Sequence, residues 1–326
     1  MVEYILNLIS EKSGALNVLT YLSSRTISST LTGLLIVLLF GDKFIQIIKK
    51  FQFNQNFDGR APESHKKKDG TPTMGGILII GSVVLSGLIW GDLSNKYLLL
   101  GLACLVGFAI IGFIDDYKKI FSLDSTGLSS TTKIFYQTMV ALVVSIILFA
   151  SSTSPQELEY IVPFFKNISI ELGVGFIFLS VFILVGSSNA VNLTDGLDGL
   201  AILPVIIITA ALGIIAWAAG NVIAAEYLYI PYLATTGELL VLCGALIGAG
   251  IGFLWFNAYP AQIFMGDIGS LSMGAFIAFV AIVVRHEIVF AVMSAVFIME
   301  ALSVILQVGS FKIRKKRVFK MAPIHH

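Results

Sequence analysis

Long apolar stretches alternate with short polar segments along most of this sequence. Each stretch has about the 20 residues that an α-helix needs to cross the hydrocarbon core of a bilayer. The pattern predicts about nine spans, at residues 23–48, 72–91, 96–114, 131–151, 172–189, 200–220, 238–256, 268–285 and 287–310. The expected fold is all-α: a polytopic transmembrane helical bundle, formed by one integral-membrane domain over residues 1–326.

The composition agrees with a membrane protein. Hydrophobic residues make up 56% of the chain and charged residues 13%, which is about half the charged share of a soluble domain. A net charge of +1 gives no electrostatic reason to expect nucleic acid as a partner. Cys104 and Cys243 each fall inside a predicted span, far in sequence from another thiol, so we expect them to pack rather than form a disulfide or a zinc site.

Basic residues are concentrated in the segments after the first, third and ninth predicted spans. Lys and Arg in short loops mark the cytoplasmic face, so the N-terminus is expected outside the membrane. The loops after spans one, three, five, seven and nine then share the cytoplasmic face, and every unusual polar motif falls in one of them. Of the 21 basic residues, all lie on that face except Lys12, Arg25, Lys96, Lys166 and Arg285.

Aspartates stand at the ends of several spans. Asp115 and Asp116 close the third, Asp195 and Asp198 follow the fifth in "NAVNLTDGLDGL", and Asp267 precedes the eighth. Grouped carboxylates repel one another unless a cation intervenes, and Mg²⁺ prefers such oxygens while keeping positions for water and phosphate. The pattern favours a Mg²⁺-dependent phosphate site.

Each of these groups also has a simpler interpretation when taken alone. Asp115 and Asp116 can be a solvated helix end balanced by neighbouring lysines, and "DGLDG" can be a polar turn. Their combination on one face favours a shared site, in which Lys68, Lys119 and Lys133 meet the remaining phosphate charges.

Two further segments add candidates at the same face. In "NAYPAQIFMGDIGS", Asn257 offers an amide, Phe264 a flat ring that can stack a nucleobase or anchor at the interface, and Gly266 an open backbone. In "MAPIHH", His325 and His326 follow a basic run, where imidazoles bind phosphate or transfer protons.

Two spans carry features that bear on packing. The seventh, "GALIGAGIGFLW", has the small-residue spacing that lets membrane helices approach closely, either within the fold or across a homodimer. The ninth contains Glu300, which is expected to face a groove or a polar partner because a charged group in lipid is costly.

Five segments resemble, in order, the motifs of the phospho-N-acetylmuramoyl-pentapeptide transferase family, within the polyprenyl-phosphate N-acetylhexosamine-1-phosphate transferase superfamily. They are "SHKKKDGTPTMGG", "DDYKK", "NAVNLTDGLDGL", "NAYPAQIFMGDIGSLSMG" and "KRVFKMAPIHH". The paired aspartates are similar to the whole superfamily, and "GTPTMGG" and "MAPIHH" to the muramoyl-pentapeptide branch. The family pattern continues past a third His to a tenth helix, whereas this sequence ends at His326.

The resemblance implies transfer of phospho-MurNAc-pentapeptide from UDP-MurNAc-pentapeptide to undecaprenyl phosphate, giving lipid I and UMP at the bacterial inner membrane. It implies that Asp267 binds Mg²⁺ and that Asp115 and Asp116 are catalytic or hold the lipid phosphate. Lys68, Asp198 and Phe264 would surround the uracil, with His325 and His326 near the phosphates. Thr73, Asn189, Asn192, Asp195, Asn257 and Gln307 would line the rest of the pocket.

Two other functions compete with this interpretation. A sibling enzyme would transfer GlcNAc-1-phosphate to a polyprenyl phosphate through the same aspartates. A nucleotide-sugar transporter would place its polar groups near the bilayer midplane, often within repeated halves, whereas the polar groups here lie at one surface. The route also stays open at this stage, since direct attack by the lipid phosphate and a two-step route through Asp267 or Asp116 as nucleophile both fit the sequence.

Overall fold

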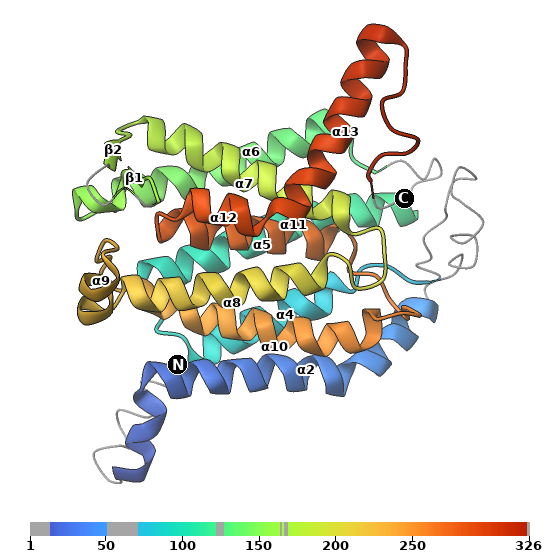
Figure 1. The fold of residues 1–326 in the computed structure, drawn as a ribbon. Coiled ribbons are helices and arrows are strands. Elements are labelled where there is room, and N and C mark those ends of the chain that lie inside the picture. Colours follow the sequence, from blue (N-terminus) through green and yellow to red (C-terminus); the bar gives the residue numbers. More distant parts are fainter. Residues whose placement is uncertain (1–13, 51–70, 122–126, 164, 166–168, 325–326) are drawn as a thin grey trace.

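The computed structural model describes residues 14–50, 71–121, 127–163, 165 and 169–324, and these are mostly helical. Among them, eight helices are long and apolar enough to cross a membrane, and the shorter α4 (Gly76–Trp90) is a ninth apolar helix in the expected order. The predicted all-α polytopic bundle is confirmed (Figure 1). The eight are α2 (Leu22–Lys50), α5 (Lys96–Phe121), α6 (Ser130–Ala150), α7 (Gly175–Thr194), α8 (Ile202–Ala219), α10 (Leu239–Asn257), α11 (Gly266–Val283) and α13 (Ala295–Arg314).

Short elements connect these helices. Strand β1 (Glu159–Ile161) pairs with β2 (Ser169–Glu171) as an antiparallel hairpin, and α9 (Val222–Leu228) follows α8. Figure 1 shows the hairpin and α9 at the same end of the bundle as the first described residues. The remaining short elements are the 3₁₀ helices η1 (Gly14–Thr20), η2 (Pro155–Glu157) and η3 (Thr236–Glu238), and the α-helix α12 (Glu287–Met293).

Helix α11 lies at the centre of the bundle, with 89% of its apolar stretch buried. The backbones of the neighbouring helices α5 and α7 lie in direct contact with the backbone of α11. A Cβ atom added at Gly112 of α5 would collide with the backbone of Asp267, and one added at Gly274 would collide with Ser187 and Ser188 of α7. Because these glycines let the backbones meet, the end of α5 lies directly against the start of α11. We call this end of the bundle the site end.

Helices α2 and α10 pack through a stripe of small residues. A Cβ at Gly244 or Gly248 of α10 would collide with Thr30 of α2, and one at Gly33 of α2 would collide with Ala245. The small-residue spacing predicted from the sequence therefore acts within the fold. The expected packing role of the two cysteines is also confirmed, since Cys104 and Cys243 are both buried and free.

The ninth predicted span differs from the expected single helix. It is divided at Ser294 into α12, which continues along the bundle, and α13, which turns away from it (Figure 1). Only 17% of the apolar stretch of α13 is buried. Residues 287–308 contain neither Gly nor Pro, so the sequence gives only a serine as a signal for this bend, and serines are a known but weak cause of helix kinks.

Candidate active site

Three helices bring two acids and two lysines together at the site end. Asp115 lies one turn before Lys119 on α5, Lys133 lies in the first turn of α6, and Asp267 in the first turn of α11. The Lys119 ammonium lies 2.8 Å from Asp115 Oδ2 and 2.9 Å from Asp267 Oδ2. The Lys133 ammonium lies 3.3 Å and 2.6 Å from the same two oxygens. Each lysine therefore bridges carboxylates that are more than 150 positions apart in the chain.

Asp116 is buried beside this cluster and accepts a hydrogen bond from the backbone N–H of Ile268, at 3.2 Å. Next to it is Gly266, whose φ of +71° favours glycine. A Cβ at Gly266 would lie 2.6 Å from Asp116 Oδ2 and 2.7 Å from Thr73 Oγ1. Thr73 and Asp116 therefore flank the same stretch of backbone, and Gly266 is required by both its conformation and its surroundings.

Asn192 fixes the other oxygen of Asp267. Its amide nitrogen donates to Asp267 Oδ1 at 2.6 Å and to Ser270 Oγ at 2.8 Å, and the Ser270 hydroxyl donates to the Gly266 carbonyl. The Asp267 carboxylate is thus held from both sides, by an amide at one oxygen and by two ammonium groups at the other. Such bracing fixes the direction in which its free electron pairs point.

Two side chains join the loops that close the site end. Asn257 accepts from the Gly199 N–H at 3.0 Å and donates to the Ile263 carbonyl at 2.9 Å, while Asp198 accepts from the Ala261 N–H at 3.1 Å. Both therefore tie residues 195–200 to residues 257–266. Phe264 is buried, with only 4% of the residue exposed. In this structure its ring is therefore covered by protein, and its predicted stacking on a nucleobase stays a prediction.

Asp195 follows α7 and has a carboxyl oxygen, Oδ1, that is buried without a hydrogen-bond partner among the described residues. Burial raises the pKa of the Asp195 carboxyl well above its usual range. The nearby charges of Asp267 and Asp116 raise it further, and a hydrogen bond from the Gly266 N–H acts in the opposite direction. Burial and the neighbouring carboxylates therefore both favour the neutral form of this carboxyl over the charged one.

Asn189 lies one turn before Asn192 on α7 and is joined to α6. Its amide donates to Gln137 Oε1 at 2.7 Å and to the Val185 carbonyl at 2.8 Å. Gln137 is fully buried and lies one turn after Lys133. The sequence analysis missed Gln137 and Ser270. Both had a signal, because each lies three or four residues from a candidate on the same helix face.

Some predicted residues are not part of this cluster. Gln307 of α13 accepts from the backbone N–H groups of Val318 and Phe319, each at 3.0 Å. Glu300 has the polar partner expected of it, since its Oε2 accepts from the Ile324 N–H at 2.8 Å. Lys68, His325 and His326 lie outside the described residues, and their predicted roles stay predictions.

The donor set fits a magnesium ion. No three His, Cys, Asp or Glu side chains of the described ranges converge enough to enclose a metal by themselves. Mg²⁺ needs only one or two protein carboxylates, with water and phosphate oxygens completing its shell. Asp115 and Asp267 turn oxygens toward shared cations, the two lysine ammonium groups, so these hard oxygen donors suit a positively charged ligand.

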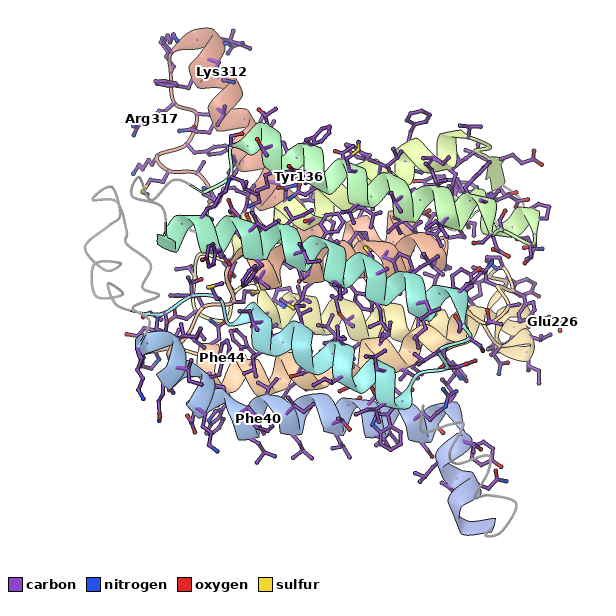
Figure 2. All side chains as sticks on the ribbon, turned by 180° about the vertical axis from the view of Figure 1, so that it is seen from behind. Phe40, Phe44, Tyr136, Glu226, Lys312 and Arg317 are labelled. Atoms are coloured by element: carbon purple, nitrogen blue, oxygen red, sulfur yellow. The ribbon has the colours of Figure 1, made fainter. Side chains whose placement is uncertain are left out.

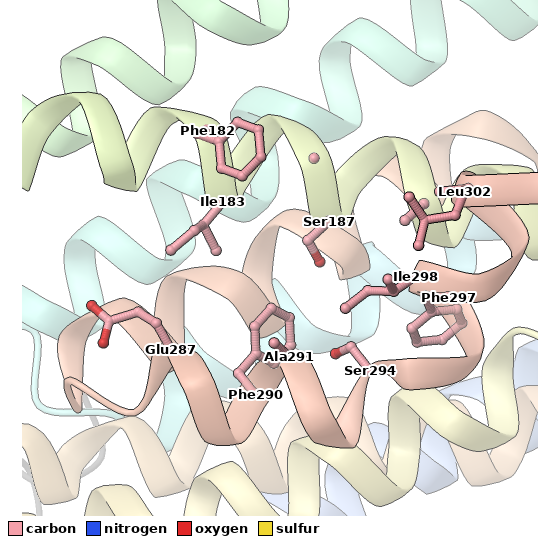
Figure 3. A pocket seen from close by; sticks show the side chains of 13 residues that line it. Phe182, Ile183, Ser187, Glu287, Phe290, Ala291, Ser294, Phe297, Ile298 and Leu302 are labelled. Atoms are coloured by element: carbon pink, nitrogen blue, oxygen red, sulfur yellow. The ribbon is translucent and has the colours of Figure 1, made fainter. Parts of the chain in front are cut away.

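An apolar pocket of about 330 Å³ lies between α7 and the bent pair α12 and α13. Figure 3 shows Phe182 and Ile183 of α7 on one side, with Phe290 of α12 and Ile298 and Leu302 of α13 on the other. Its walls are almost entirely apolar, so it suits a hydrocarbon chain rather than a nucleotide.

The fold and the site define a class of protein: an integral membrane protein with a centre of acids and lysines at one end of an apolar bundle. A family model described as glycosyl transferase family 4 matches residues 98–285, which is more than half of the 326 residues. The phospho-N-acetylmuramoyl-pentapeptide-transferase signature 1 matches residues 68–80. The chain belongs to glycosyl transferase family 4, within it to the phospho-N-acetylmuramoyl-pentapeptide transferases of the polyprenyl-phosphate hexosamine-1-phosphate transferase superfamily.

Proposed function

We propose that this protein transfers phospho-MurNAc-pentapeptide from UDP-MurNAc-pentapeptide to undecaprenyl phosphate, giving lipid I and UMP. The observation that carries the proposal is the set of contacts in which Lys119 and Lys133 each join Asp115 to Asp267. A site that mixes carboxylates with fixed cations suits two phosphate-bearing substrates and a divalent ion. The signature over residues 68–80 supports the muramoyl-pentapeptide donor.

In the proposed reaction, an oxygen of undecaprenyl phosphate attacks the phosphorus next to the sugar. The bond from that phosphorus to the bridging oxygen breaks, and UMP leaves with the bridging oxygen. Three phosphate groups meet in this step, so their negative charges must be neutralised and the reacting atoms held in line. Lys119 and Lys133 supply two fixed positive charges for that purpose.

Asp115 is proposed to accept the proton of the lipid phosphate or to orient it, since its carboxylate lies beside both lysines. Asp267 is proposed to hold Mg²⁺, which when bound would neutralise charge on the diphosphate. Asn192 and Ser270 keep the Asp267 carboxylate in one orientation. Asp116, held by the Ile268 N–H, adds a further buried acid to the same wall.

We favour direct attack by the lipid phosphate over a route through an aspartyl phosphate on Asp267 or Asp116. The reason is that Asp267 Oδ1 and Oδ2 are both engaged, by Asn192 and by the two lysines, which lowers its strength as a nucleophile. Incubating the protein with labelled UDP-MurNAc-pentapeptide without lipid tests this. A covalent phospho-sugar retained on the denatured protein would exclude the direct route.

We further propose that the site end faces the cytoplasm of a bacterial inner membrane. Among the described residues, every Lys and Arg lies at the site end except Arg25, Lys96 and Arg285. Each of these three is neutralised by an acid, in the pairs Arg25–Glu238, Lys96–Glu157 and Arg285–Glu287. Unpaired positive charge thus gathers at one end, as the positive-inside rule requires of a cytoplasmic face.

The apolar pocket between α7 and α13 is proposed to receive prenyl units of the lipid substrate. Its lining carries almost no polar surface, which suits a hydrocarbon chain. A polyprenyl phosphate would then place its chain in this pocket and its phosphate toward the lysines. The position of the polar groups at one end, not at the midplane, is the feature that speaks against a transporter.

The test is a transfer assay on the purified protein with undecaprenyl phosphate and Mg²⁺, supplied with either UDP-MurNAc-pentapeptide or UDP-GlcNAc. We expect lipid I and UMP from the first donor only, and loss of turnover on removal of Mg²⁺ by a chelator. Asp267→Asn should lower turnover by roughly 10²–10³-fold, the usual cost of losing an electrostatic group at a reacting centre. If product formed with UDP-GlcNAc and not with UDP-MurNAc-pentapeptide, the protein would be the sibling GlcNAc-1-phosphate transferase instead.

A further inference from the structure

No step of the proposed reaction is assigned to the far end of α13, where the segment "KRVFKMAPIHH" begins, and this end has an unusual surface. Figure 2 shows Lys312 and Arg317 there, beyond the body of the bundle. Most of α13 is exposed, because only 17% of its apolar stretch is buried, against 89% for α11. In a membrane protein, a helix that leaves its neighbours in this way is surrounded by lipid.

Positive charge is concentrated at this end. No acidic residue occurs between Ala301 and Ile324, and no described residue forms an ion pair with a cation of this stretch. We call the segment from Phe311 to Lys320 the basic tip. Its six cations, all exposed, are Lys312, Arg314, Lys315, Lys316, Arg317 and Lys320.

Large apolar side chains are exposed among these cations. The exposed fractions are 51% for Phe311, 82% for Ile313 and 56% for Val318. Exposed apolar and basic groups on one short segment are typical of a surface that lies at the boundary between hydrocarbon and headgroups. If this segment were surrounded by water, its exposed apolar side chains would not gain the free energy of burial.

The basic tip is also held in one conformation. Helix α13 ends at Arg314, and the next residue, Lys315, lies in the left-handed region with φ of +54°. The chain then returns along the helix, where Gln307 binds the backbone of Val318 and Phe319, and Ser310 donates to the Lys316 carbonyl at 2.9 Å. Cations from the helix end and from the returning chain are therefore presented together, and less ordering is needed when they bind.

From this combination we infer that the basic tip is a binding surface for anionic phospholipid headgroups, which anchors α13 at the membrane surface of the site end. Arg and Lys bind lipid phosphate through charge-assisted hydrogen bonds, and clusters of four to eight cations next to a membrane helix attract anionic lipid. Phe311, Ile313 and Val318 enter the acyl boundary beside them. The inference goes beyond the proposed transfer reaction and does not depend on it.

Binding of phosphatidylglycerol and of phosphatidylcholine to the purified protein, measured by native mass spectrometry without substrate, tests the inference. Neutralising three cations in Lys315→Gln/Lys316→Gln/Arg317→Gln should weaken phosphatidylglycerol binding by about 100-fold, since each near-surface cation contributes about fivefold. Phosphatidylcholine binding should not change. The charge-preserving variant Lys315→Arg/Lys316→Arg/Arg317→Lys should bind as the parent does.

A matched control removes three exposed cations elsewhere at the site end, in Lys43→Gln/Lys49→Gln/Lys50→Gln on α2. An equal loss in this variant would overturn the inference, as would unchanged binding in the tip variant. Inorganic pyrophosphate distinguishes the source of the phosphate. If it displaced phosphatidylglycerol at matched concentration, the tip would be a site for small anions and the lipid surface would be excluded.

Discussion

At the site end, single side chains contact charged groups from more than one helix. Lys133 illustrates this, since its ammonium contacts both Asp115 and Asp267 from a third helix. The carboxylates would repel each other at this distance without such cations. The lysine therefore holds the acids together in the free protein, and we propose that it faces phosphate when substrate is bound.

Replacing Lys133 by Met should lower kcat/KM for lipid I formation by at least about 100-fold, because it removes a fixed charge at the reacting centre. The matched control is Lys118→Met. Lys118 is exposed on α5 next to Lys119, and no described carboxylate pairs with it, so we expect near-parental turnover. The transfer assay described above measures both. Similar losses in the two variants would show that bulk charge, not the bridge, matters.

At the scale of elements, contacts between backbones decide which helices are neighbours. The stripe Gly244, Gly248 and Gly252 of α10 lies against α2, and a Cβ at each of these positions would meet an atom of α2 at 3.0 Å or less. Membrane helices gain little from hydrophobic burial against each other, so close packing of this kind carries much of their association.

Gly248→Ala should therefore lower the free energy of unfolding by about 1–3 kcal/mol, the usual cost of overpacking. A Cβ there would collide with the Thr30 carbonyl, which is backbone and has little freedom to move. Gly81→Ala in α4 is the control, since nothing lies within 4 Å of a Cβ at that position. Thermal unfolding in detergent compares the two; equal melting temperatures would contradict the close contact.

The connection between α6 and the hairpin depends on one carboxylate. Glu157 Oε2 accepts from the Lys96 ammonium and from the Tyr97 hydroxyl, both at 2.9 Å, and Oε1 accepts from Thr153. Burial acts to raise the pKa of Glu157, but the hydrogen bonds from Thr153, Lys96 and Tyr97 together outweigh it, and the pKa lies below its ordinary value of 4.5.

A carboxylate with a lowered pKa stabilises the fold above its ordinary pKa, and this contribution is lost as the pH falls through the folded value. Glu157→Gln should therefore melt at a lower temperature than the parent at about pH 7, and the difference should shrink as the pH falls below the ordinary glutamate pKa of 4.5 and through the lowered folded value. Glu226→Gln, at an exposed position on α9, should melt as the parent does throughout. A pH-independent difference for Glu157→Gln would point to lost packing instead.

At the scale of the whole molecule, the two ends of the bundle differ in their unpaired charge. Figure 2 shows Glu226 at one end and Lys312 and Arg317 at the other. Among the described residues, unpaired cations gather at the end that also holds Asp115 and Asp267, while Arg25, Lys96 and Arg285 at the opposite end are each paired with an acid. One orientation in the membrane therefore places the whole site in one compartment.

Cysteine labelling in intact cells checks this orientation. Tyr227→Cys, at a position 81% exposed on α9, should react with a membrane-impermeant maleimide. Lys316→Cys, at the site end, should react only after the cells are opened. Cys104 and Cys243 are buried and give little background. Labelling of both variants from the same side would overturn the shared cytoplasmic site.

The sequence by itself determined the number and order of the apolar helices and the identity of the charged candidates. The reason is that lipid requires long apolar segments, and a charge within one is costly wherever it lies, so Asp115, Asp116 and Asp267 stand out without any knowledge of neighbours. The small-residue spacing of α10 was visible for the same reason, although its partner helix was not.

Only the tertiary structure decided which of these groups meet. Lys119 and Lys133 bridge Asp115 and Asp267, and Ser270 and Gln137 support Asn192 and Asn189, through contacts between segments far apart in sequence. The bend of the ninth span at Ser294 is likewise seen only in the structure. Local periodicity reports the face of a helix but not what lies opposite that face. The close backbone contacts of α11 with α5 and with α7 determine which of these side chains lie opposite one another.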